Sequence, residues 1–137
     1  MFFSKTLAIA ALAVTANAAA ILKTRQSYLT GTQTGDGTFY TPGLGACGVT
    51  NTASDLMVAV SETLFDSYPG YNGANPNSNP VCGKKIKASY GGKSVTVTVE
   101  DRCTGCAETD LDFSPTAFTA LAAESVGRIH GMTWVWA

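Results

Sequence analysis

Two aspartates in the second half of the chain, Asp101 and Asp112, carry the side chains best suited to chemistry. Asp101 follows a run of alternating valine and threonine, and Asp112 lies in the segment Leu-Asp-Phe-Ser-Pro. A carboxylic acid in a partly dry groove has a raised pKa and can protonate or hydrogen-bond an oxygen atom of a ligand, and a neighbouring carboxylate raises the pKa further. The structural alternatives are that Asp112 accepts backbone N–H groups of a helix beginning at Pro115, and that Asp101 pairs with Arg102 or Arg128.

Aromatic side chains among polar residues offer a second kind of chemistry, stacking on sugar rings beside hydrogen-bonding groups. The candidate binding residues are three tyrosines and nearby amides: Tyr40, Tyr68, Tyr71, Asn72, Asn75 and Asn77. The alternative for every aromatic residue is core packing, which we expect for Phe39, Phe65, Phe118 and at least one of Trp134 and Trp136.

The four cysteines indicate two disulfides, for which three pairings are formally possible. Gly105 would let the chain turn sharply enough to close a short ring between Cys103 and Cys106. Cys47 would then pair with Cys82. A redox pair, or half of a zinc site, is the alternative for the Cys-x-x-Cys motif, but no βαβ pattern surrounds it and the other cysteines lack ligand spacing.

Other classes of site find little support in the sequence. His130 is the only histidine and has no recognisable nucleophile partner, which argues against a hydrolase triad. No cluster has metal-ligand spacing, so we expect no metal and no cofactor. The formal net charge is −1 and the only basic cluster is Lys84, Lys85 and Lys87, so nucleic acid is not an expected partner. We expect a monomer.

The N-terminus has the features of a signal peptide. Lys5 supplies a positive charge, and residues 7–14 form an apolar run too short to cross a bilayer. We predict cleavage after Ala18, with Ala19 or Ala20 as near alternatives, and an extracellular protein that contacts no membrane after cleavage. Further trimming after Arg25 is a weaker possibility. Residues 19–34 are predicted to be a flexible lead-in, and residues 35–137 one domain.

The remaining pattern predicts a mainly β domain that would position the two acids. We expect a first strand at residues 37–40, a buried strand at 56–60, a helical turn capped by Ser61, and a long surface loop at 68–80. Alternation at residues 86–90 and 95–99 around Gly91-Gly92 predicts a hairpin. Ser114 and Pro115 begin a helix that Gly127 ends, and a last strand reaches Trp136.

The motifs occur together in an order that resembles a known family. The ordered set is Gly43-Leu44-Gly45-Ala46-Cys47-Gly48, the strand at 95–99, Asp101-Arg102-Cys103, and the segment 110–115 with its helix. It is similar to the six-stranded double-psi β-barrel of the expansin and rare-lipoprotein-A type, and among these to loosenins, the single-domain fungal expansin-like group. The resemblance covers residues 35–137.

The resemblance implies an open polysaccharide groove with Asp112 as the essential acid, at the start of the helix, and Asp101 as a second acidic position. Thr38 matches the hydroxyl residue of the expansin Thr-Phe-Tyr strand. The pairing of Cys47 with Cys82 also agrees with the expansin pattern. The implied partner is a cell-wall polysaccharide, β-glucan or chitin-like.

Whether a bond is cut depends on a second carboxylate. An inverting glycosidase needs a base roughly 6.5 to 9.5 Å from its acid. The related barrel of glycoside hydrolase family 45 carries that base just after its first strand, whereas residues 37–54 here contain no Asp or Glu. We therefore predict a non-lytic wall-loosening protein, with Asp110 solvated.

Three alternatives remain. One is a binding module or protease inhibitor on the same barrel, with the 68–80 loop as its surface. Another is a hydrolase with Asp36 or Glu62 displaced into the base position. The third is a peptidoglycan lytic transglycosylase, which needs only one acid.

Overall fold

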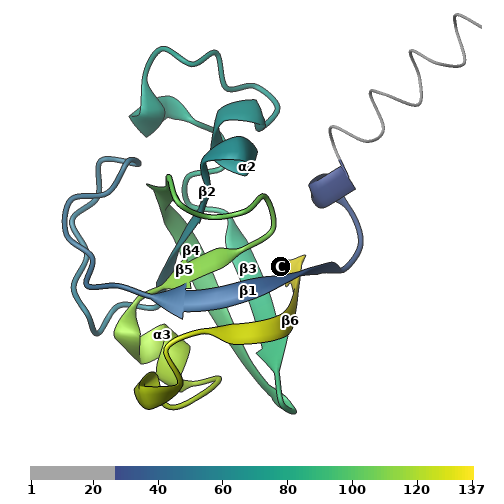
Figure 1. The fold of residues 1–137 in the computed structure, drawn as a ribbon. Coiled ribbons are helices and arrows are strands. Elements are labelled where there is room, and N and C mark those ends of the chain that lie inside the picture. The colour runs from purple at the N-terminus through teal and green to yellow at the C-terminus, as the bar shows by residue number, and fades with distance from the viewer. Residues whose placement is uncertain (1–26) are drawn as a thin grey trace, which may run out of the picture.

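Six strands close into a barrel in the computed structural model, which describes residues 27–137 (Figure 1). The strands are β1 (Gln33–Phe39), β2 (Met57–Ser61), β3 (Lys85–Tyr90), β4 (Lys93–Cys103), β5 (Leu111–Phe113) and β6 (Ile129–Trp136). The short helix η1 (Ser27–Leu29) precedes β1, and between the strands lie α2 (Glu62–Ser67), η2 (Pro76–Ser78), α3 (Pro115–Thr119) and η3 (Glu124–Val126). The predicted fold class, a six-stranded barrel with short helices, is confirmed.

The strand order around the barrel differs strongly from the order along the chain. It is β1-β5-β2-β4-β3-β6, closed by pairing of β6 with β1. The pairs β1–β5 and β2–β4 are parallel, and the other neighbours are antiparallel. Residues from distant parts of the sequence therefore meet on β1, β5, β2 and β4.

The β3–β4 hairpin forms as its alternating pattern predicts. Ile86, Val97 and Val99 point into the core and are 0 to 1% exposed, while their sequence neighbours face out. Gly91 and Gly92 make the turn with φ of 57° and 78°, the left-handed region that a two-residue hairpin turn of this type requires.

Both predicted helix starts are confirmed, but the second helix is shorter than expected. The Ser61 hydroxyl accepts the Leu64 N–H, and the Ser114 hydroxyl accepts the Ala117 N–H. The helix α3 ends at Thr119 instead of continuing to Gly127. The chain tightens there into a 3₁₀-type turn, in which the Leu121 N–H donates to the carbonyl of Phe118, three residues earlier. Gly127 ends the separate turn η3.

The flexible lead-in predicted for residues 19–34 is wrong for residues 27–34, which are packed against the barrel. Tyr28 is fully buried, and its hydroxyl lies 2.8 Å from Ser67 Oγ at the end of α2. The Gln33 amide donates to the Ser27 and Thr30 carbonyls, which fixes the approach to β1. Residues 1–26, including the predicted signal peptide and the cleavage sites, lie outside the described residues.

The two predicted disulfides are confirmed. Cys47 pairs with Cys82 and joins the segment after β1 to the end of the 68–80 loop. Cys103 pairs with Cys106 and closes a tight turn after β4.

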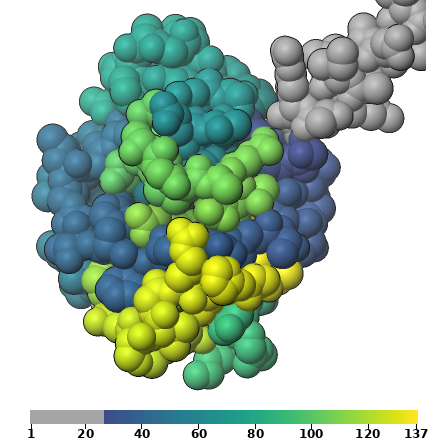
Figure 2. Space-filling model, in the orientation of Figure 1, coloured from purple at the N-terminus to yellow at the C-terminus, as the bar shows by residue number. Residues whose placement is uncertain are grey.

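The helix α2 and the 68–80 loop stand together as a teal lobe above the barrel (Figure 2). Within residues 27–137, no helix has the length and apolar character needed to cross a bilayer.

Candidate functional site

Four residues from four neighbouring strands form one row across the barrel. The register pairs Thr38 of β1 with Asp112 of β5, Asp112 with Ala59 of β2, and Ala59 with Asp101 of β4. Their neighbours along the strands, such as Val58 and Leu111, are fully buried in the core. Because residues paired in register point to the same side of a sheet, the row faces outward. The small side chain of Ala59 separates the two carboxylates.

Asp112 lies in the middle of β5, not at the start of a helix as the sequence resemblance implied. Ser114 caps the helix N-terminus instead, so Asp112 does not have the alternative role of accepting backbone N–H groups of that helix. Thr38 Oγ1 donates a 2.9 Å hydrogen bond to Asp112 Oδ1. Burial raises the pKa of Asp112 above its ordinary value, the Thr38 hydrogen bond opposes this, and the negative charge of Asp101 adds to it.

Asp101 reaches the row because β4 contains an irregularity at Glu100. The register shifts there, so that Val58 pairs with Val99 but Ala59 pairs with Asp101. Without this extra residue, strict alternation from the buried Val99 would turn Asp101 toward the core. The valine pattern alone would have buried the Asp101 carboxylate, and the bulge places it on the outer face instead.

The oxygens of Asp101 are held by three donors. Oδ1 accepts the backbone N–H groups of Ala46 and Arg102, both at 2.8 Å, and Oδ2 accepts the Tyr40 hydroxyl at 2.7 Å. The predicted ion pairs of Asp101 with the Arg102 or Arg128 side chain are not formed. Arg102 instead binds Glu62 and Asp66.

The Gly43–Gly48 segment holds this arrangement from outside. Besides the Ala46 contact, the Cys47 N–H donates to the Glu100 carbonyl at the bulge. A Cβ added to Gly45 would overlap that same carbonyl oxygen, so the close approach needs glycine. The sequence motif was recognised, but its role in fixing Asp101 was not predicted.

Tyr40, predicted to bind a ligand, lies beside the row as a hydrogen-bond partner of Asp101. It is half-buried, and burial together with its hydrogen bond to Asp101 raises the pKa of the phenol far above its ordinary value. Its hydroxyl is thus a fixed neutral donor.

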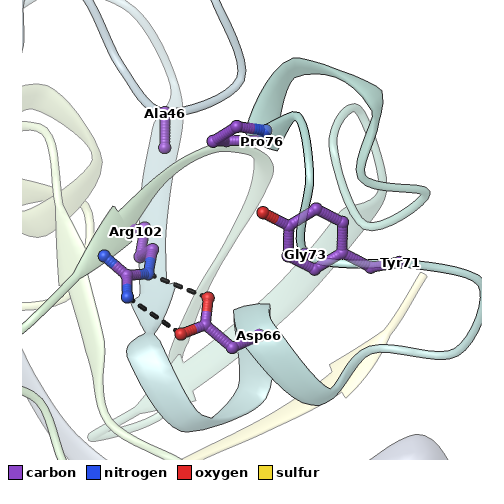
Figure 3. A pocket seen from close by; sticks show the side chains of 6 residues that line it. All are labelled: Ala46, Asp66, Tyr71, Gly73, Pro76 and Arg102. Atoms are coloured by element: carbon purple, nitrogen blue, oxygen red, sulfur yellow. Dashed lines mark hydrogen bonds and ion pairs between the residues drawn. The ribbon is translucent and has the colours of Figure 1, made fainter.

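The two loop tyrosines lie in different places. Tyr71 packs edge-on against Phe65 and lines a cleft of about 420 Å³ that is also lined by Arg102 and Asp66 (Figure 3). Ala46, which binds Asp101, lies on the rim of the same cleft, so the cleft adjoins the row. Tyr68 packs edge-on against Trp136 and does not line this cleft.

The sequence and the coordinates agree with one family. Residues 32–132 match the family model described as lytic transglycolase, a rare-lipoprotein-A-like double-psi β-barrel. The chain belongs to this double-psi β-barrel family.

Relatives of this double-psi β-barrel come from fungi and bacteria. The chain is 37% identical to the papain inhibitor of Streptomyces mobaraensis, over 74% of this chain and 68% of that protein. It is 38% identical to "Allergen Asp f 7 homolog" of Arthroderma benhamiae over 74% of this chain, and that match spans only 38% of the relative's own length.

Two solved double-psi barrels are also similar. The Streptomyces papain inhibitor superposes with a TM-score of 0.70 at 35% identity, covering 80% of this chain and 96% of the inhibitor. A variant expansin of Clavibacter michiganensis in complex with cellohexaose gives a TM-score of 0.62 at 28% identity, covering 78% of this chain and 50% of the expansin.

The other candidate acids of this double-psi barrel are engaged elsewhere. Asp36 binds Arg128 and His130, each at 3.1 Å, and these contacts lower its pKa, the His130 hydrogen bond most strongly. Asp110, predicted to be solvated, accepts the backbone N–H groups of Asp36 and Ala107. Within residues 27–137, no group of acidic, histidine or cysteine side chains has the arrangement of a metal site.

Proposed function

We propose that this double-psi barrel binds a cell-wall polysaccharide, β-glucan or chitin-like, along the row of Thr38, Asp112 and Asp101, and loosens polymer contacts without cutting the chain. The Tyr71 cleft beside Ala46 would extend the groove with an aromatic face. The relative solved with cellohexaose supports a glucan as a ligand of this barrel type.

The observation that carries the proposal is the difference between the two acids. Asp101 is committed to three donors, whereas Asp112 has one hydrogen bond to a side-chain hydroxyl and a raised pKa. Asp112 is thus the acid able to hydrogen-bond or protonate a sugar oxygen.

A free base opposite Asp112 would be needed to activate water for inversion. The two residues considered for that role both have side-chain partners: Asp36 contacts Arg128 and the His130 imidazole, and Glu62 pairs with Arg102. This supports binding and loosening over hydrolysis. It does not argue against a lytic transglycosylase, because that reaction needs only one acid, so the experiment must measure cleavage as well as binding.

The experiment is a pull-down with cellulose, chitin and peptidoglycan, combined with assays for released soluble sugars and for the tensile strength of cellulose filter paper. We expect binding and weakening without sugar release. The Asp112→Asn variant should lose weakening at an unchanged melting temperature, while Glu124→Gln, which makes the same chemical change at an exposed acid outside the row, should behave as wild type. Full activity of Asp112→Asn would reject the proposal, and sugar release would replace it with lytic cleavage.

A second candidate is inhibition of cysteine proteases, favoured by the match that covers 96% of the Streptomyces papain inhibitor. The loop at residues 68–80, tied down by the Cys47–Cys82 disulfide, would be the contacting surface. Titration of papain activity with the purified protein distinguishes the two functions. Stoichiometric inhibition that Asp112→Asn leaves intact would favour the inhibitor.

We also propose that the protein acts outside the cell. Two disulfides are typical of an oxidising compartment, and the sequence of residues 1–18 has the pattern of a signal peptide. N-terminal sequencing of protein from culture medium should begin at Ala19. Retention of the full chain inside the cell would contradict this.

A further inference from the structure

The lysines of the described residues gather on one hairpin. All four lie within residues 84–93: Lys84, Lys85, Lys87 and Lys93. The four ion pairs found in residues 27–137 use Arg102, Arg128 and His130, and none of them uses a lysine. Lys85 has a polar partner, but this is the neutral Thr98 hydroxyl at 3.1 Å. Lys84, Lys87 and Lys93 are therefore open to an external anion, whereas Lys85 also lies near enough to Glu100 for their charges to attract.

Hydroxyl groups surround the lysines on the same outer surface. The residues that face out from β4, β3 and β6 form what we call the lysine face: Lys85, Lys87, Ser89, Ser94, Thr96, Thr98, Thr133 and Val135. The register pairs Lys85 with Thr98, and Lys87 with Thr96. Ser89 pairs with Thr133 on the other side. Each of the two β3 lysines thus has a threonine hydroxyl beside it on β4, while the β6 neighbour of Lys87 is the apolar Val135.

Two hollows border this face. One, of about 250 Å³, is lined by Lys87, Ser89 and Thr133. The other, of about 270 Å³, is lined by Lys84, Lys85 and the aromatic pair Tyr68 and Trp136, whose ring centroids are 5.9 Å apart. Each hollow therefore combines a cation with either hydroxyls or an aromatic surface.

The lysine face lies across the barrel from the acidic row. In the closed order β1-β5-β2-β4-β3-β6, the lysine face is centred on β3, three strands away from β5, which carries Asp112, and the two surfaces share only β4. A ligand on one face would leave the other free.

We propose that the lysine face binds an acidic polysaccharide, a chain of uronic acid residues. The ammonium groups match the repeated carboxylates, the threonine and serine hydroxyls match sugar hydroxyls, and Trp136 and Tyr68 offer surface to a sugar ring. The hydroxyl surface favours a glycan over an anionic lipid, and both arginines of residues 27–137, the side chains suited to bidentate phosphate contacts, are bound to carboxylates. Together with the proposed groove, the protein would join a neutral and an acidic polymer.

The test is retardation in affinity electrophoresis by polygalacturonate, with fully methyl-esterified pectin as the ligand control because it has the same backbone without charge. Each exposed contact is weak and screened by salt, so Lys85→Gln/Lys87→Gln should weaken binding about tenfold. Single substitutions provide the matched comparison. Lys87→Gln should reduce binding, and Lys93→Gln, at the hairpin turn, should change it less than about twofold.

The outcomes separate this proposal from the groove. Retention by polygalacturonate that persists in Asp112→Asn supports the lysine face whether or not the groove binds glucan. Equal retention by methyl-esterified pectin, or loss in Lys93→Gln equal to that in Lys87→Gln, would overturn it. Equally strong binding to duplex DNA or phosphatidylserine vesicles would overturn it as well, because the surface would then act only as a diffuse positive charge.

Discussion

Thr38 and Asp112 are register partners on the parallel strands β1 and β5, and the Thr38 hydroxyl donates a 2.9 Å hydrogen bond to Asp112 Oδ1. This bond favours the ionised carboxylate, whereas burial and the charge of Asp101 favour the neutral acid. The net effect is a raised pKa. Protonation of Asp112 is therefore set by its burial together with Thr38, Asp101 and the more distant charge of Arg128, and each of these side chains can be changed separately.

The first prediction concerns the pH dependence of stability. Because the pKa of Asp112 is higher in the folded than in the unfolded state, its contribution to stability is fully present below the unfolded pKa and is lost as the pH rises through the folded pKa. Asp112→Asn cannot ionise, so its stability relative to wild type should increase as the pH rises from the unfolded pKa of about 3.9 through the higher folded pKa. Urea unfolding across this range measures the difference, and a constant difference would show that the pKa is not raised.

The second prediction concerns Thr38. Thr38→Val removes the hydrogen bond that favours the ionised acid, so the pKa of Asp112 should rise further. If the protonated acid acts in loosening, the fall of activity at high pH should move to higher pH. Carbon NMR titration of the Asp112 carboxyl measures the shift directly. Thr38→Ser keeps the hydroxyl and should titrate as wild type, and identical titration of the valine variant would contradict the role of this bond.

Local patterns predicted the parts of the fold that depend on neighbouring residues. Alternating valines identified the β3–β4 hairpin, and Ser61 and Ser114 identified two helix starts, because these signals act over a few positions. Tyr28 was missed because its burial depends on α2, a contact with residues far along the chain.

The sequence named the residues of the candidate row but did not predict how the strands arrange them. The strand β5 has only three residues and exists because it pairs with β1 and β2, so Asp112 was expected at a helix start. The alternation of β4 gives no sign of the extra residue at Glu100, although that residue decides which way Asp101 faces. Bulges of this kind depend on packing from other segments, here the approach of Gly45.

The third prediction concerns Tyr40, whose hydroxyl binds Asp101 at 2.7 Å. Tyr40→Phe removes the hydroxyl that donates to Asp101 Oδ2. Because this carboxylate oxygen is partly buried, its loss of a donor should lower the free energy of unfolding by about 1 to 2 kcal/mol. Tyr90→Phe is a matched control, because Tyr90 is also half-buried and its hydroxyl has no hydrogen bond to any of residues 27–137. Chemical denaturation should separate the two variants, and equal stability would mean that the Asp101 bond contributes nothing.

The fourth prediction tests whether the Gly43–Gly48 segment fixes Asp101. Gly45→Ala places a methyl group against the Glu100 carbonyl, so the segment must move away from the bulge and weaken the Ala46 N–H bond to Asp101. We expect a loss of about 1 to 3 kcal/mol in stability. Gly43→Ala is the matched control two positions earlier, since a Cβ there meets nothing within 4 Å.

The same pair of variants also separates the position of Asp101 from overall stability. If Asp101 is released, its charge moves relative to Asp112, and the titration of the Asp112 carboxyl should change in Gly45→Ala but not in Gly43→Ala. Carbon NMR titration at a temperature where both variants are folded provides the measurement. A destabilised Gly45→Ala variant with an unchanged Asp112 titration would mean that the segment supports the barrel without positioning the second acid.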